Sequence, residues 1–464
     1  MLFSSLTFLY AFLPPVLLLA FLRRDVRWQN GVLLAASLLF YAWGDPRSLP
    51  LLLGTTLAVW ACGLGIAWGK RPAIRRGCFA LSLLLLIGTL FLFKYLNFFA
   101  STLSALAGQS WSLRQIALPA AISFTTFQLL SYVIDLKRGQ IRPEKNLFRF
   151  LLYVCFFPQL LQGPIVRYGE IASELSVRYI RRDDVLSGSR RFVLGLAKKV
   201  LLADTVAVIA SRIYAAPSLA GTSALWLAGL CYTLQIYFDF SGYSDMALGL
   251  GLLFGFHLPE NFSYPYAARS VTEFWRRWHM TLSRWFRDYV YIPLGGNRVS
   301  RPRFLLNILA VWALTGLWHG ASWNFVLWGV YNGALLLLEK LVFKHRDRLP
   351  APLQNLITFL LVLVGWVIFS LPDFSVLSRV LRGMFVFSPT DWKALLCMDT
   401  SMVSKLPALL PALLFSFPLF DKLRIKEDGL LSALAVNGFY LGLLAVCILF
   451  LISQSFHPFL YFNF

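Results

Sequence analysis

The chain contains Ile308-Leu-Ala-Val-Trp-Ala-Leu-Thr-Gly-Leu-Trp-His-Gly320, followed directly by Ala321-Ser-Trp-Asn-Phe-Val-Leu-Trp-Gly-Val330. These two apolar stretches enclose a single ionisable side chain, that of His319. Apolar runs of this kind are typical of membrane helices, where a polar side chain is costly and usually has a function. Histidine also exchanges protons near neutral pH. His319 is therefore the first candidate functional residue.

The composition of the whole chain also indicates a membrane protein. Of its 464 residues 58% are hydrophobic and only 14% are charged, and the mean hydropathy is +0.66. Soluble domains carry about 25% charged residues. We predict an all-α, polytopic integral membrane protein. Residues 1–464 are expected to form a single membrane-embedded domain, because no soluble segment is long enough to make a second.

The apolar runs predict about eleven transmembrane helices together with re-entrant and interfacial helices. Residues 222–240 and 244–258 are expected to form separate segments. The run 146–163 lies between two basic loops and is expected to enter and leave the membrane on one side. Lys and Arg collect in loops, as they do on the cytoplasmic side of membrane proteins. This pattern predicts a multi-pass membrane protein.

The net charge of +21 does not indicate a nucleic-acid partner, because the basic residues are scattered between apolar runs. Contact with anionic lipid headgroups explains them better. None of the six cysteines forms a Cys-x-x-Cys pair. Neither a disulfide framework nor a metal site is therefore expected.

Residues 259–303 differ from the apolar runs around them. A turn-rich stretch at 259–266 precedes Trp275, Trp278, Leu282 and Trp285, which recur at three- and four-residue spacing. The spacing predicts one amphipathic helix at the membrane interface. His279 lies on this helix and is the second candidate, although it could also be an ordinary interfacial residue.

The remaining candidates each have a structural alternative. Trp318 and Asn324 could cover or orient the ring of His319, which could itself be a buried histidine in a helix-breaking turn allowed by Gly316 and Gly320. Asp239 could face a cavity, or pair with an arginine from 269–287.

Four arginines lie largely off the apolar face of the predicted interfacial helix. Guanidinium groups suit a phosphate-rich substrate, and equally suit lipid headgroups. The four are Arg276, Arg277, Arg284 and Arg287.

Four stretches resemble the membrane-bound O-acyltransferase (MBOAT) superfamily, and within it the bacterial branch of alginate O-acetylation and teichoic acid D-alanylation membrane proteins. They lie within a motif core of about 119–335. The stretches are 123–135, 157–165, 235–297 and 315–324, of which Trp-Arg-Arg-Trp-His and Leu-Trp-His-Gly are the most specific.

The resemblance implies a helical fold around a tunnel in which an acyl donor meets an acceptor. His319 matches the signature histidine and His279 the second polar residue, forty positions earlier. His319 would act as general base while a hydroxyl attacks an acyl thioester. Arg276 and Arg277 would face the phosphates of the donor. Trp275, Trp318, Asn324 and Asp239 complete the predicted substrate-binding set.

The resemblance implies an O-acetyltransferase of the bacterial inner membrane that uses cytoplasmic acetyl-CoA as a substrate, with no permanently bound cofactor. The expected acceptor is an exopolysaccharide, such as alginate, or a cell-wall glycan, reached through a periplasmic acetyltransferase partner. D-alanyl transfer from a carrier protein is the alternative within the enzyme class. A proton-coupled transporter or a non-catalytic scaffold would be alternatives of another class.

Overall fold

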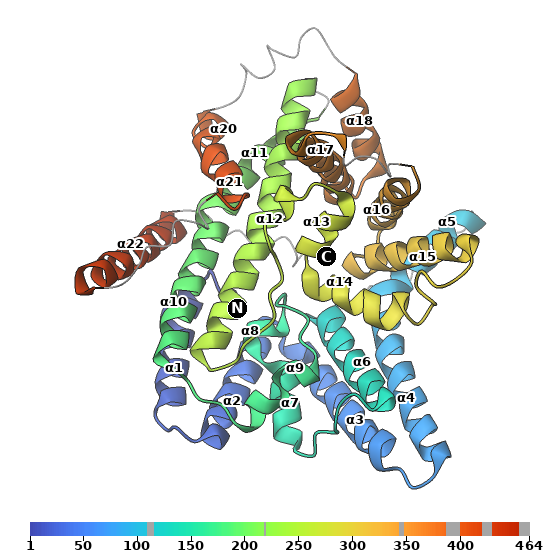
Figure 1. Ribbon diagram of the computed structural model, residues 1–464, viewed down its shortest axis with the longest axis vertical. Coiled ribbons are helices and arrows are strands. Elements are labelled where there is room, and N and C mark those ends of the chain that lie inside the picture. The colour runs from blue at the N-terminus through green and yellow to red at the C-terminus, as the bar shows by residue number, and fades with distance from the viewer. Residues whose placement is uncertain (109–115, 218–219, 343–347, 387–399, 420–428, 454–464) are drawn as a thin grey trace. The chain divides into compact units, whose positions relative to one another are not determined.

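The computed structural model describes residues 1–108, 116–217, 220–342, 348–386, 400–419 and 429–453. Within these ranges every regular element is a helix, as Figure 1 shows, and none is a strand. The predicted all-α fold class is therefore confirmed for the described part of the chain. The chain divides into two compact units, residues 1–192 with 244–260 (unit 1) and residues 193–243 with 261–464 (unit 2). The organisation as one domain stays a prediction.

Unit 1 begins with a series of helices that pack through apolar faces. Phenylalanine rings form its centre, with centroids 4.9 to 6.4 Å apart among Phe3, Phe8 and Phe157. Helices α3, α4 and α6 lie side by side (Figure 1). The helices of this unit are η1 (Thr7–Phe12), α1 (Leu13–Phe21), α2 (Val26–Gly44), η2 (Pro46–Ser48), α3 (Leu49–Trp68), α4 (Pro72–Leu90), η3 (Phe91–Tyr95), α5 (Leu96–Ala107), α6 (Ile122–Arg138), α7 (Leu147–Cys155), α8 (Phe157–Leu160), α9 (Tyr168–Ser176) and most of α10 (Arg182–Ala197).

Local chemistry sets several helix ends in unit 1. The Asp25 carboxylate accepts the Trp28 backbone N–H at the start of α2. Gly139 adopts a left-handed φ of 71° after α6. The expected membrane segment at 146–163 is divided into α7 and α8 around the buried Phe156, so neither helix alone has the length of a span.

Unit 2 contains the longest helix and the centre of the sequence motifs. Its helices are η4 (Lys198–Ala203), α11 (Asp204–Ala215), α12 (Thr222–Leu253, whose last turns belong to unit 1), η5 (Pro265–Ala267), α13 (Val271–Arg277), α14 (Met280–Phe286), η6 (Arg287–Tyr291), α15 (Arg301–His319), α16 (Trp323–Leu341), α17 (Ala351–Ser370), α18 (Phe374–Phe385), α20 (Thr400–Val403), η8 (Leu406–Ala408), α21 (Leu409–Phe415) and α22 (Leu430–Ser453). Buried Trp278, Trp328 and Trp366 lie in its core.

Two helix boundaries differ from the sequence prediction. The separate segments expected at 222–240 and 244–258 are wrong, because α12 runs through Ser241 and Gly242. A residue other than Gly at position 242 would meet the backbone of Gly195, so this glycine serves close helix packing. The single amphipathic helix expected to carry Trp275, Trp278, Leu282 and Trp285 is also wrong, because the helix breaks between α13 and α14 at His279.

Helices α15 and α16 form a closely packed hairpin. A Cβ on Gly316 would meet the Phe325 carbonyl, and one on Gly329 would meet the Trp312 carbonyl. Gly316 is helical and allows the close approach of α16, whereas Gly320 is extended, with φ of −170°, and ends α15 directly after His319, where the sequence predicted a helix break.

Four helical segments of the described chain are long and apolar enough to cross a membrane. They are Pro46–Trp68, Pro72–Ala107, Ala351–Ser370 and Leu430–Ser453. The expected count of about eleven transmembrane helices stays a prediction.

Candidate functional site

A cavity of about 520 Å³ in unit 2 contains both candidate histidines in its wall. Its lining comes from α13, α14, η6, α15 and α16. His279 and His319 are distant in sequence, and folding brings them to one cavity. The volume is within the range of small-molecule binding sites in proteins, which is about 300–1,000 Å³.

His319 is the last residue of α15 and is only 4% exposed. Three aromatic rings surround its imidazole, with centroid distances of 4.9 Å to Trp318, 5.1 Å to Trp328 and 5.3 Å to Phe369. All three meet it edge to face. Such a wall limits water near the ring and strengthens polar contacts with a bound substrate.

Trp318 connects the two histidines. Its ring centroid is 4.9 Å from that of His319 and 5.9 Å from that of His279. Trp318 therefore contacts the His319 ring, and its role in covering that ring stays a prediction.

His279 occupies the break between α13 and α14 with a left-handed backbone, φ 42° and ψ 54°. This conformation is uncommon outside glycine and is held only by strong local contacts. Its Nδ1 lies 3.1 Å from Asn261 Oδ1, and the Phe240 ring packs at 4.8 Å. Burial lowers the pKa of His279 to about 3, so the ring is neutral at physiological pH.

The same cavity is strongly basic. Trp275 and four cationic side chains line it. The indole Nε1 of Trp275 is buried and has no hydrogen-bond partner within the described residues. The cationic side chains are Arg276, Arg284, Arg287 and Lys340. Guanidinium and ammonium groups at this density suit an anionic, phosphate-bearing ligand.

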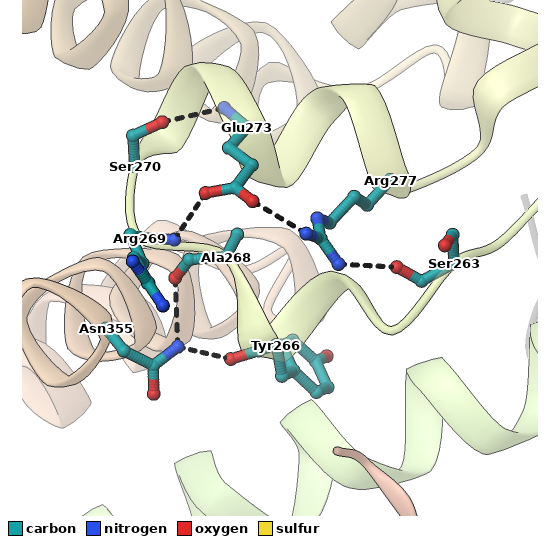
Figure 2. Close-up of polar contacts among 8 residues, drawn as sticks. All are labelled: Ser263, Tyr266, Ala268, Arg269, Ser270, Glu273, Arg277 and Asn355. Carbon is teal, nitrogen blue, oxygen red and sulfur yellow. Dashed lines mark hydrogen bonds and ion pairs between the residues drawn. The ribbon is translucent and has the colours of Figure 1, made fainter. Parts of the chain in front are cut away.

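Arg277 contributes differently from its neighbour Arg276. Figure 2 shows its guanidinium donating to the Glu273 carboxylate at 2.7 Å and to the Ser263 carbonyl at 3.3 Å. Glu273 in turn accepts the Arg269 backbone N–H at 2.8 Å. Arg277 therefore braces α13 against the preceding loop, and only Arg276 of the pair lines the cavity.

Asn355 of α17 holds the other side of that loop. Its side-chain amide donates to the carbonyls of Tyr266 and Ala268 at 2.7 and 2.9 Å (Figure 2). The start of α13 is capped by the Glu339 carboxylate of α16, which accepts the Val271 N–H at 2.8 Å. These contacts fix the element that carries Trp275 and Arg276.

Asn324 and Asp239 are buried but are not among the cavity-lining residues within the described chain. The Asn324 amide donates to the Phe369 carbonyl at 2.9 Å, and the Phe369 ring contacts His319. Asp239 accepts a hydrogen bond from Lys199 at 2.6 Å, so a lysine fills the role that the sequence analysis gave to an arginine from 269–287.

Sequence reasoning missed Asn261, Thr281, Trp328, Phe369 and Lys340 as parts of this site. Asn261 lies in the turn-rich stretch at 259–266, which was noted without a role for its side chain. Nothing in the spacing of Lys340 distinguishes it from a residue at a helix end. Within the described residues no group of three or more His, Cys, Asp or Glu is placed to hold a metal ion. The expectation of no metal site stays a prediction.

The arrangement can accept a proton and bind negative charge within one cavity. A neutral imidazole can remove a hydroxyl proton, and the nearby cations can hold the anionic part of a donor.

Comparison with known proteins agrees with this chemistry. Residues 141–377 match the model of the MBOAT, membrane-bound O-acyltransferase family. The chain is 42% identical to the probable alginate O-acetylase of Pseudomonas aeruginosa over 83% of this chain and 75% of that protein. It is 37% identical to the corresponding protein of Pseudomonas putida over the full length of both. It is 32% identical to the peptidoglycan O-acetyltransferase of Helicobacter pylori, over 100% of this chain and 98% of that protein.

Proposed function

The chain belongs to the membrane-bound O-acyltransferase family and is a membrane acyltransferase, and on this premise we propose that it moves acetyl groups from cytoplasmic acetyl-CoA across the bacterial inner membrane to a polysaccharide. The family membership confirms the resemblance inferred from the four sequence stretches. The names of the three relatives support an acetyl group and a glycan acceptor, such as alginate or a cell-wall glycan.

One observation carries the proposal: His279 and His319 line the same cavity as a cluster of cationic side chains. The transfer joins an acceptor hydroxyl oxygen to the acetyl carbonyl carbon and breaks the carbon–sulfur bond of the thioester. His319 takes the hydroxyl proton and returns it to the departing thiolate. The aromatic wall around His319 keeps water from competing with the hydroxyl.

The donor is held through its phosphates. Arg276 is the arginine of the predicted pair that lines the cavity, and Arg284, Arg287 and Lys340 add positive charge to the same wall. Trp275 provides an indole N–H beside these groups. His279 is the second member of the site and orients the donor or supports the acceptor. The final transfer to the polysaccharide takes place through a periplasmic acetyltransferase partner.

The test compares two histidine variants in the producing bacterium at matched protein levels in the membrane. His319→Ala removes the proposed base. His257→Ala is the control, because this histidine belongs to unit 1 and its side chain is 56% exposed. Acetate released from surface polysaccharide by mild alkali is then measured.

We expect His319→Ala to abolish ester-linked acetate and His257→Ala to leave it unchanged. Normal acetylation with His319→Ala would overturn the proposed base. Release of D-alanine in place of acetate from wild-type polymer would overturn the proposed acyl group.

A further inference from the structure

Asn261 fixes the break in which His279 lies. The side chain of Asn261 is 1% exposed, and its Oδ1 faces three groups: Thr281 Oγ1 at 2.9 Å, the Thr281 backbone N–H at 3.3 Å, and His279 Nδ1 at 3.1 Å. Its carbonyl also accepts the Met280 N–H at 2.9 Å. One asparagine therefore holds the backbone of residues 280–281 and the imidazole of His279 together.

These contacts decide the tautomer of His279. The backbone N–H of Thr281 can only donate, so the atom that faces it must be the amide oxygen of Asn261. A ring nitrogen beside that oxygen forms a hydrogen bond only if it carries hydrogen. His279 Nδ1 is therefore protonated, and in the neutral ring the lone pair lies on Nε2.

The Nε2 atom is the part of His279 left for a ligand. It is buried, and within the described residues it has no hydrogen-bond partner. The ring lines the same cavity as His319. A buried acceptor without a partner is costly, and a bound substrate that donates a hydrogen bond would remove the cost.

Resting on the acyl transfer proposed above, we infer that Asn261 is a positioning residue that holds His279 as the Nδ1–H tautomer, so that Nε2 accepts a hydrogen bond from a substrate N–H or O–H. Because His319 accepts the proton of the reacting hydroxyl, the substrate N–H or O–H that donates to His279 is not deprotonated. An amide N–H of the thioester arm and a neighbouring hydroxyl of the glycan both fit. A neutral His279 so held cannot donate to the oxyanion from Nε2.

The substitution Asn261→Asp tests the tautomer with little change in shape. All three partners donate to Oδ1, and the Asn261 Nδ2 has no hydrogen-bond partner within the described residues, so a carboxylate keeps every contact. The added negative charge favours the doubly protonated ring, in which Nε2 donates and no longer accepts.

Other charged and titratable groups also act on His279. The cationic side chains of the cavity wall disfavour a positively charged His279. Asp239, which precedes Phe240 on α12, is already paired with Lys199. The wall groups are His319, Arg276, Arg284, Arg287 and Lys340.

The experiment uses the full-length protein in membrane vesicles of a producing strain that lacks the wild-type chain, with periplasmic extract that supplies the proposed partner. It follows free thiol released from acetyl-CoA, with and without alkali-treated surface polysaccharide. The variants are Asn261→Asp, Asn261→Ala and the control Asn332→Ala. Asn332 is a buried asparagine of the same unit whose amide donates to the Trp328 carbonyl.

We expect Asn261→Ala to lower kcat/KM about tenfold to a hundredfold at every pH, as loss of an imidazole-orienting partner does elsewhere. Asn261→Asp should match wild type at high pH and, as the pH is lowered, lose activity at a higher pH than wild type, because the added carboxylate favours the protonated ring. A raised KM for acetyl-CoA would assign the bond at Nε2 to the thioester arm. A loss seen only with polysaccharide would assign it to the glycan.

An Asn261→Asp pH profile that superimposes on wild type would overturn the inference, as would an Asn261→Ala variant with wild-type kcat and KM. Failure of the proposed function is seen separately, as wild-type protein that releases no thiol. The tautomer of His279 can also be determined independently of activity by ¹⁵N NMR of histidine-labelled protein. A protonated Nε2 on neutral His279, identified by loss of its signal in His279→Gln, would contradict the inference.

Discussion

Replacing Lys199 by methionine should destabilise the protein strongly. The Lys199 ammonium lies 2.6 Å from an Asp239 oxygen and 2.7 Å from an Asp204 oxygen. The side chains of Lys199 and Asp239 are each 2% exposed, and that of Asp204 is 12% exposed. Methionine preserves the length of the side chain but leaves two buried carboxylates without their cation.

The expected loss is about 3–5 kcal/mol in the free energy of unfolding, the usual effect of removing one partner of a buried ion pair. It can be measured by unfolding with SDS in mixed micelles. Arg287→Met is the matched control, because the Arg287–Asp288 pair is exposed (59% for the arginine) and such pairs contribute only about 0–1 kcal/mol.

Adding Asp239→Asn to Lys199→Met should recover part of the loss, because it removes one of the uncompensated charges. A Lys199→Met protein as stable as wild type would contradict this prediction. It would mean that water or another group already balances the carboxylates.

Three further predictions concern the site and its scaffold. Arg276→Ala should raise the KM for acetyl-CoA, whereas Arg277→Ala should mainly lower the free energy of unfolding. Kinetics and unfolding measured on both variants would distinguish the two effects, and the reverse pattern would contradict the roles given to the two arginines. Gly329→Ala should cost about 1–3 kcal/mol by overpacking α16 against α15, while Gly438→Ala, which has open space, should cost almost nothing. The pKa of about 3 for His279, which lies outside the four candidate spans, is below its unfolded value near 6.5. Between these two pH values the unfolded state binds one more proton than the folded state, so the free energy of unfolding should decrease as the pH is lowered through this window. This dependence should be weaker in His279→Asn, and an equal dependence in both proteins would contradict the prediction.

The sequence was sufficient for the all-α class and the family, and it drew attention to the two histidines that line one cavity. The apolar runs identify helices because the bilayer and the core both require them. His319 stands out because an ionisable residue between two apolar runs has few structural reasons to be there.

The break at His279 could not be predicted, because Trp275, Trp278 and Leu282 keep helical spacing across it. The break depends on Asn261, which precedes the helix and contacts it only after folding. Arg276 and Arg277 are adjacent and chemically identical, so the sequence does not distinguish their roles. In the structure Arg277 pairs with Glu273, whereas Arg276 lines the cavity.

The pairing of Asp239 with Lys199 could not be predicted from the sequence either. Lys199 lies forty residues earlier in a π-helical turn, and no local pattern links the two. Arginines near Asp239 in sequence were the simpler expectation, and the packing of η4 against α12 determined the outcome.

We propose that His279 and His319 act together in one acyl-transfer site. This is tested by a double-mutant cycle with His279→Ala, His319→Ala and both changes, measured as kcat/KM for thiol release from acetyl-CoA in the presence of periplasmic extract and polysaccharide. Residues that act as a unit are strongly non-additive, so the double variant should be about as slow as the slower single variant. Losses that simply add, or full activity in either single variant, would contradict the shared site.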